Sequence, residues 1–145
     1  MNNQAVRAYT RLLKPKSIKK GSRKEKPPLF HPRVLVFDTE CRVNCAQPLT
    51  IGYAAVYDYF VLARECVFYD PETLTKKEMG VVKDFSKQRN IVAVPVQEFI
   101  DNYLINEIQE KNTVCLGYNL AFDLGRLGTN FGRAKYTYKG GFSIK

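Results

Sequence analysis

The chain has 145 residues, which is enough for one domain with a hydrophobic core. Hydrophobic residues make up 45% and charged residues 26%, as in a globular protein, and no apolar run reaches the roughly 18 residues of a membrane span. The four cysteines include no Cys-x-x-Cys pair and there is one histidine, so the composition excludes the usual zinc sites. We therefore expect a cytoplasmic protein with reduced cysteines and no membrane partner.

The positive charge is concentrated at the N-terminal end. Residues 1–28 carry nine Lys or Arg and one acid, Glu25, and so hold +8 of the net charge of +9. Three prolines and Gly21 interrupt any long helix in this stretch. We expect a flexible basic arm over residues 1–28 that attracts phosphate backbones without reading their sequence. A solubilising leader without a specific partner, or an organelle transit peptide, is the alternative.

The folded body is expected over residues 29–145. Its first strand contains four consecutive apolar residues, which indicate a strand covered on both faces. The second strand follows from alternation along Leu49–Tyr57. The third strand begins close behind it, and a tight turn at Asp58-Tyr59 would join the two into an antiparallel hairpin. Three strands are thus predicted in order: Arg33–Phe37, Leu49–Tyr57 and Phe60–Tyr69.

Helices alternate with a further strand after the hairpin. Pro95 suits the first turn of a helix, and apolar residues recur at helical spacing after it. The order of the whole body, three strands, a helix, a strand and a helix, predicts an α/β fold, in which the last strand lies parallel to the first one. The predicted elements are a short helix over 76–85, a longer helix over 95–109, a strand over 113–117 and a helix over 119–127.

The first strand delivers two carboxylates at its C-terminal end. Asp38 and Glu40 are two residues apart, so in an extended chain both side chains point to the same side. Two carboxylates on one face repel each other unless a cation lies between them, and Mg²⁺ or Mn²⁺ prefers such oxygen ligands. The simpler alternative is a solvated turn after a buried strand.

A second stretch, Gly117–Leu127, follows the last predicted strand and carries another acid. Asn119 is a good N-cap, and Asp123 then lies in the first turn of a helix beside the edge of the sheet. There Asp123 can meet Asp38 and Glu40, which would give three oxygen ligands around one or two metal ions. The alternative is that Asn119 caps the helix and Asp123 only favours its dipole, by about 0.3–1 kcal/mol.

These two stretches resemble the motifs of a known enzyme family. Phe37-Asp38-Thr39-Glu40 looks like the first motif of the DEDD superfamily of 3′→5′ exonucleases, the ribonuclease H-like group that includes proofreading domains of DNA polymerases. Asn119-Leu120-Ala121-Phe122-Asp123 looks like the second motif, in a form similar to that of protein-primed family B polymerases of phages and linear plasmids. The resemblance covers about residues 33–128, with Asp38 and Asp123 85 residues apart.

The resemblance implies a ribonuclease H-like mixed sheet with flanking helices, and hydrolysis of phosphodiester bonds with two metal ions, Mg²⁺ or Mn²⁺. It also implies single-stranded DNA, or alternatively RNA, as a partner, and a polymerase domain in the intact protein. The implied catalytic residues and metal ligands are Asp38, Glu40 and Asp123. The implied nucleic-acid-binding residues are Thr39, Asn119 and Phe122.

The chain departs from the family pattern in its last part. The third motif needs a His or Tyr followed closely by a fourth carboxylate, but no acid follows Asp123, and the one histidine, His31, precedes the first motif. Without these groups the second metal ion is poorly held, so we expect an exonuclease domain incomplete at its C-terminus, with weak or no activity. The alternative is a non-catalytic nucleic-acid-binding remnant that uses the basic arm.

Overall fold

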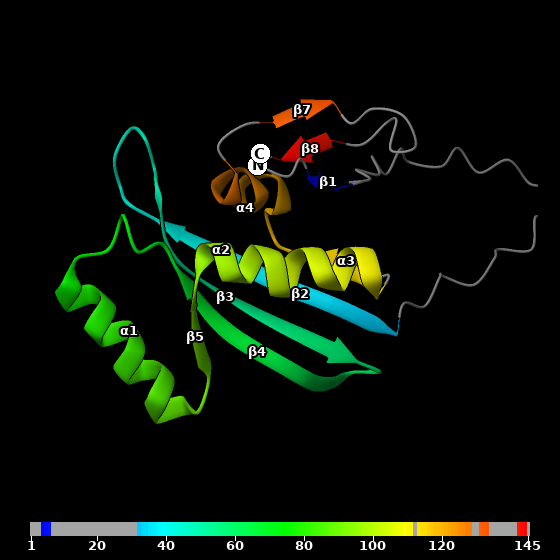
Figure 1. The fold of residues 1–145 in the computed structure, drawn as a ribbon, viewed down its shortest axis with the longest axis horizontal. Coiled ribbons are helices and arrows are strands. Elements are labelled where there is room, and N and C mark those ends of the chain that lie inside the picture. The colour runs from blue at the N-terminus through cyan, green and yellow to red at the C-terminus, as the bar shows by residue number, and fades with distance from the viewer. Residues whose placement is uncertain (1–3, 7–31, 112, 129–130, 134–141, 145) are drawn as a thin grey trace, which may run out of the picture.

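The computed structural model describes residues 4–6, 32–111, 113–128, 131–133 and 142–144 (Figure 1). Within this part of the chain, the main layer is a mixed sheet of five strands in the order β5-β4-β3-β2-β6. The fold is therefore α/β, as predicted. The strands of the main sheet are β2 (Arg33–Cys41), β3 (Leu49–Asp58), β4 (Val61–Tyr69), β5 (Val92–Pro95) and β6 (Val114–Leu116).

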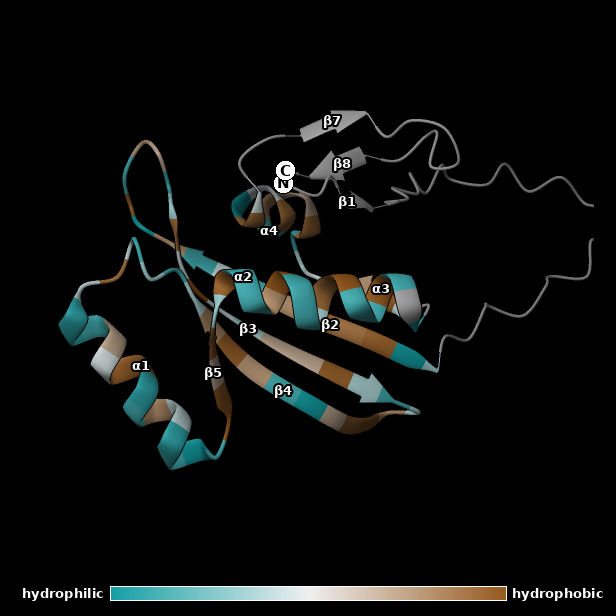
Figure 2. Ribbon diagram, in the orientation of Figure 1, coloured by the Kyte–Doolittle hydropathy of each residue, from teal (hydrophilic) through white to brown (hydrophobic). Residues whose placement is uncertain are grey.

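Helices follow β4, β5 and β6. The helices are α1 (Lys76–Arg89), α2 (Val96–Phe99), the π-helical η1 (Ile100–Ile105), α3 (Asn106–Glu110) and α4 (Leu120–Leu127). The segments α2, η1 and α3 form one continuous helical run that crosses the sheet (Figure 1). Hydrophobic and hydrophilic residues alternate around this run (Figure 2), as in a helix that packs with one face.

The hydrophobic core lies between one face of the sheet, the helical run and α4. Its centre is Phe99, whose ring stacks on Phe68 with 3.9 Å between ring centroids and lies 5.8 Å from Phe37. Leu124 and Leu127 fix α4 against the same core. These contacts hold α4 close to β2, which places the second motif beside the first.

The strand β2 is longer than predicted and is covered on one face. It runs to Cys41, so both carboxylates of the first motif belong to the strand itself. Leu35, Phe37 and Thr39 are buried on the core side, whereas Val36 between them is exposed. The prediction that both faces of the strand are covered was therefore wrong. Buried and exposed side chains alternate along β2 although four consecutive residues are apolar.

The antiparallel hairpin of β3 and β4 is confirmed, and its turn lies one residue later than predicted. The two turn residues are Tyr59 and Phe60, with φ values of 46° and 67°. Asp58 and Val61 pair on either side of them. Positive φ at both central residues is the geometry that twists a two-residue turn to match its strands.

Two differences concern the second half of the chain. The short strand β5 was not predicted, and it pairs parallel to β4 at the edge of the sheet. Helix α1 extends to Arg89, and it begins with a capping box between Thr75 and Glu78. The longer helix, the strand β6 and its parallel pairing with β2 are confirmed, with Val36 opposite Leu116.

A small second sheet in the described residues has the order β1-β8-β7. Its strands are β1 (Gln4–Val6), β7 (Phe131–Arg133) and β8 (Phe142–Ile144). Thus three residues of the expected basic arm lie in a strand, and the other residues of the arm, like His31, lie outside the described residues. None of the helices in the described ranges is both long and apolar enough to cross a membrane. All four cysteines are free thiols.

Candidate functional site

The candidate site lies where the parallel strands β2 and β6 end. The C-terminal ends of these two strands share one edge of the sheet, and the chain that leaves β6 at this edge turns directly into α4. The carbonyl oxygen of Asn119 accepts hydrogen bonds from the backbone N–H groups of Phe122 (2.8 Å) and Asp123 (3.1 Å), which starts the helix. Asp123 therefore points from the first turn of α4 toward β2.

Asp123 is held by the residue between the two acids of the first motif. Its Oδ1 accepts hydrogen bonds from the backbone N–H of Thr39 (3.2 Å) and from the Thr39 hydroxyl (2.7 Å). The side chain of Asp123 is 1% exposed. These two bonds fix the carboxylate and direct its second oxygen away from Thr39.

That second oxygen, Asp123 Oδ2, is buried and has no hydrogen-bond donor in the described part of the chain. A Cβ built on Gly117 would lie 3.5 Å from Oδ2 and 3.2 Å from the carbonyl oxygen of Phe37, so a larger residue at position 117 would crowd this space. Burial, together with the Asp123 carboxylate, raises the pKa of the nearby Cys115 thiol to about 12. A buried carboxylate oxygen without a donor is costly unless a proton or cation satisfies it.

Asp38 and Glu40 share one side of β2, as predicted, but it is the side away from Asp123. Both are exposed, whereas Thr39 between them is buried toward α4. Asp38 lies opposite Tyr53 on β3, whose hydroxyl is hydrogen-bonded to Glu65. The structure thus brings Asp123 to Thr39 and leaves Asp38 and Glu40 on the other face. Among the described residues, no group of three or more acids, histidines or cysteines is placed to hold a metal ion.

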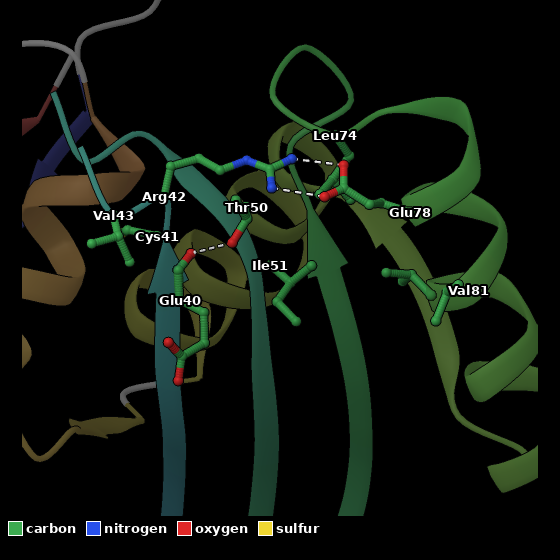
Figure 3. Close-up of a pocket in the computed structure, with 10 residues that line it drawn as sticks. Glu40, Cys41, Arg42, Val43, Thr50, Ile51, Leu74, Glu78 and Val81 are labelled. Atoms are coloured by element: carbon green, nitrogen blue, oxygen red, sulfur yellow. Dashed lines mark hydrogen bonds and ion pairs between the residues drawn. The ribbon is translucent and has the colours of Figure 1, made fainter.

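Glu40 borders an open groove of about 420 Å³ between the ends of β2 and β3 and the start of α1 (Figure 3). Ile51 and Val81 give it apolar walls. Above them Arg42 donates two hydrogen bonds to Glu78, at 2.7 and 2.6 Å (Figure 3). The groove is therefore largely apolar. The carboxylate of Glu40, for which no partner is found within the described part of the chain, lies at one end, and the Arg42–Glu78 ion pair lies at the other.

The Arg42–Glu78 pair was not predicted. Hydrogen bonds from Arg42, and then from the backbone and hydroxyl of Thr75, lower the pKa of Glu78 to about 2. Thr75-x-x-Glu78 is a capping-box sequence, so the start of the helix could have been recognised from it. The sequence does not identify Arg42 as the partner of Glu78, because 36 residues separate the two and only the fold brings them together.

The remaining predicted residues, Asn119 and Phe122, lie at the start of α4. Asn119 is the N-cap residue of α4, as predicted, but its side chain makes no capping hydrogen bond, and its backbone carbonyl accepts the first hydrogen bonds of the helix. Phe122 is covered by the guanidinium of Arg126, 4.5 Å from the ring centroid. Arg126 also donates to the carbonyl oxygens of Ala46 (3.3 Å) and Gln47 (3.1 Å), and so ties α4 to the loop after β2.

Comparison of the chain with protein-family models, with curated proteins and with solved structures gave no match. The site geometry and the two sequence motifs are therefore the basis for any functional assignment.

Proposed function

We propose that this chain is a ribonuclease H-like domain of the DEDD type, which hydrolyses phosphodiester bonds at the 3′ ends of single-stranded nucleic acids with a divalent metal ion. The proposed substrate is single-stranded DNA. More specifically, we propose that the domain proofreads for a DNA polymerase in the cytoplasm. The strand order supports this assignment, because β2 carries the first motif between an antiparallel hairpin and a parallel strand that leads into the second motif.

One observation carries the proposal: the buried Oδ2 of Asp123, without a donor among the described residues, lies at the carboxyl edge of the two parallel strands. A carboxylate oxygen is the hard donor that Mg²⁺ or Mn²⁺ takes. When bound, such an ion activates water and stabilises the leaving oxygen. Thr39 prepares the site by holding Oδ1, which leaves Oδ2 available.

The fit to a metal ion is partial. Asp123 provides one buried oxygen, but Asp38 and Glu40 are exposed on the opposite face of β2. We therefore assign Asp123 as the residue that would hold the ion and derive no catalytic step from Asp38 and Glu40. A slow reaction is expected from this arrangement, since several converging carboxylates are what hold two ions in enzymes of this chemistry.

The test is degradation of a single-stranded DNA oligonucleotide labelled at its 5′ end, in Mn²⁺ and in EDTA. We expect Mn²⁺-dependent shortening from the 3′ end that falls by at least about 100-fold in Asp123→Asn. The matched control is Asp84→Asn, which changes an exposed acid on α1. Shortening at the same rate in Asp123→Asn and in the wild type would contradict the proposal.

A second candidate is a non-catalytic nucleic-acid-binding domain. The separation of Asp123 from the other two acids favours it, as does the charge of +8 on residues 1–28. It predicts oligonucleotide binding that weakens steeply with salt, because bound phosphates release counterions. Binding that is equal in Mn²⁺ and EDTA, unchanged by Asp123→Asn and without shortening, would favour this candidate.

A further inference from the structure

The strand β5 ends the main sheet, and one edge of this strand is open. In the order β5-β4-β3-β2-β6, β5 pairs with β4 on one side, and no strand of the described residues lies on its other side. Val92, at the start of β5, is 56% exposed. An open edge presents main-chain N–H and C=O groups to which another strand can add.

The open main-chain groups of this edge belong to Ala93. In a parallel pair of strands, alternate residues direct both their N–H and their C=O toward the neighbouring strand. Pro95 has no N–H and suits the outward position of an edge strand, so Val92 and Val94 are the residues that bond to β4. Ala93 lies between them and directs its N–H and C=O away from the sheet. No hydrogen bond outside the pairing with β4 joins either group to the described residues.

A groove of about 420 Å³ lies between this open edge and helix α1. Val92 and Ala93 line it from β5, and Lys83 and Lys87 line it from the last turns of α1. The chain turns directly from α1 into β5, so the helix and the strand form the two sides of the groove (Figure 1). Its volume is within the range of about 300–1,000 Å³ that is usual for ligand sites. We call it the edge groove.

The edge groove is positively charged. Lys83 and Lys87 are four residues apart in α1, so they are neighbours on one face of the helix. None of the described residues that line the groove is an acid. The ion pairs within the described ranges do not involve these two lysines and use other cations, namely Arg33, Arg42, Arg64 and Lys111. Both ammonium groups can therefore pair with the acids of a ligand.

A buried hydroxyl group also lines the edge groove. Ser86 is 4% exposed, and its Oγ has no hydrogen-bond partner in the part of the chain that the structure describes. A buried polar group without a partner is unfavourable. A carbonyl or carboxylate oxygen brought into the groove by a ligand would supply the missing acceptor.

The spacing of the two lysines matches an extended chain. Four residues of an α-helix rise about 6 Å, and two residues of a strand rise about 6.6 Å. Acids at alternate positions of an added strand lie on the same face of that strand, so each acid can meet one lysine. A segment of the form acid-x-acid therefore fits both the main chain of Ala93 and the two positive charges.

We propose that the edge groove binds an extended acidic segment of a partner protein, which adds to the sheet as a strand beside β5. Main-chain hydrogen bonds to Ala93 contribute affinity, and the two lysines select the acidic side chains. A second copy of this chain fits less well, because two paired β5 edges would bring the lysines of both copies together. Nucleic acid also fits less well, since no aromatic residue among those described lines the groove for stacking on bases.

The edge groove and the candidate site lie on opposite sides of the main sheet. β5 and β6 are its two outer strands, and Asp123 contacts β2, the neighbour of β6. A strand that adds to β5 therefore leaves Asp123 unchanged. The proposal is independent of the proposed nuclease function.

The first experiment measures binding of the full chain to a fluorescein-labelled peptide, Thr-Val-Glu-Val-Glu-Val-Thr, by fluorescence anisotropy. We expect saturable binding whose affinity falls at least about tenfold in Lys83→Glu/Lys87→Glu. The matched control is Lys76→Glu/Lys77→Glu, which changes two exposed lysines in the first turn of the same helix. This control should bind the peptide as tightly as the wild type. A peptide with Lys in place of both Glu residues should not bind.

The second experiment tests the main-chain contact. Ala93→Pro removes the outward N–H and should lower the affinity for the acidic peptide at least about tenfold, whereas Ala93→Ser keeps this N–H and should bind like the wild type. Circular dichroism checks that both variants fold.

Hydrogen exchange followed by NMR tests the same contact in the wild-type chain. The amide of Ala93 should exchange rapidly in the free protein and at least about tenfold more slowly with the peptide bound. The amide of Val94, which bonds to β4, should be protected in both states.

Four results would overturn the proposal. Equal peptide binding by the wild type and Lys83→Glu/Lys87→Glu would show that the lysines do not select the ligand. Binding without protection of the Ala93 amide would mean attraction by charge and not strand addition. Dimers of the free chain with a protected Ala93 amide would assign the edge to a second copy. Failure to bind the peptide, with single-stranded DNA binding that is lost in Lys83→Glu/Lys87→Glu, would assign the groove to nucleic acid.

Discussion

Glu107 is the residue whose loss should destabilise the fold most clearly. It is 0% exposed, and its carboxylate accepts hydrogen bonds from Arg33 (2.6 and 3.0 Å), Arg64 (2.8 Å), Lys111 (3.0 Å) and the hydroxyl of Thr113 (2.9 Å). Through these bonds one buried acid of the helical run joins β2, β4 and Thr113, the residue that precedes β6. The variant Glu107→Gln keeps the size of the side chain and removes its charge.

The expected loss follows from the pKa of Glu107. Burial alone raises this pKa, but hydrogen bonds from Arg33, Lys111 and Thr113 outweigh burial and lower it from 4.5 to about 2. At about 1.4 kcal/mol for each unit of pKa, the difference corresponds to about 3 kcal/mol of folding free energy at neutral pH. Breaking a buried ion pair from one side costs a similar amount, about 3–5 kcal/mol.

The pH dependence of this contribution has a definite sign. Because the pKa of Glu107 is lower in the folded protein, its stabilising contribution is complete above pH 4.5 and disappears as the pH falls toward 2. Urea unfolding from pH 7 to pH 2.5 should therefore show a free-energy gap between wild type and Glu107→Gln that closes as the pH falls. The control Glu98→Gln removes an exposed acid from the same helical run. A gap below about 1 kcal/mol at pH 7, or one that does not change with pH, would refute this account.

Three further changes have expected results. Asp123→Asn should raise the free energy of unfolding in EDTA by about 1–3 kcal/mol, because it removes the charge from a buried group that has no donor among the described residues. Mn²⁺ should stabilise the wild type and should not stabilise this variant. Urea unfolding measures both effects. Tyr59→Asn/Phe60→Gly should raise the thermal midpoint by a few degrees, in differential scanning calorimetry, since both new residues accept positive φ. Thr75→Ala should cost about 1 kcal/mol in urea unfolding, because the capping box of α1 is lost.

Each of these results has a contrary outcome. A lower stability of Asp123→Asn in EDTA would mean that Oδ2 is satisfied in the folded chain. A lower thermal midpoint for the turn variant would mean that the aromatic side chains stabilise the hairpin more than their backbone strain costs. No effect of Thr75→Ala would mean that Arg42 alone holds Glu78 and the start of α1.

Periodicity in the sequence was sufficient to predict the central part of the fold. Alternation over Leu49–Tyr57 and the close succession of Phe60–Tyr69 indicated the hairpin, and the short apolar run after Thr113 indicated β6. The sequence does not predict the strand β5, because its four residues end at Pro95, a residue that also suits the first turn of a helix. So short an apolar segment has no periodicity of its own, and its pairing with β4 comes from tertiary contacts.

Sequence spacing predicted only part of the geometry of the candidate site. Spacing correctly placed Asp38 and Glu40 on one side of the strand, but it cannot tell which side faces the core. Leu35 and Phe37 face the core, so Thr39 does too, and α4 approaches from that side with Leu124 buried. Long-range packing therefore decides that Asp123 meets Thr39.

The bond between Asp123 and Thr39 also limits how far the sheet can grow. β6 pairs with β2 only from Val34 to Val36, and no strand in the described residues lies beside β2 over 37–41 on that side. An open edge of this kind is a template to which a strand from another chain can add. Asp123 accepts the backbone N–H of Thr39 in the middle of that edge, so a side chain takes the place of a neighbouring strand. The same carboxylate that suggests chemistry thus protects the chain against edge-to-edge association.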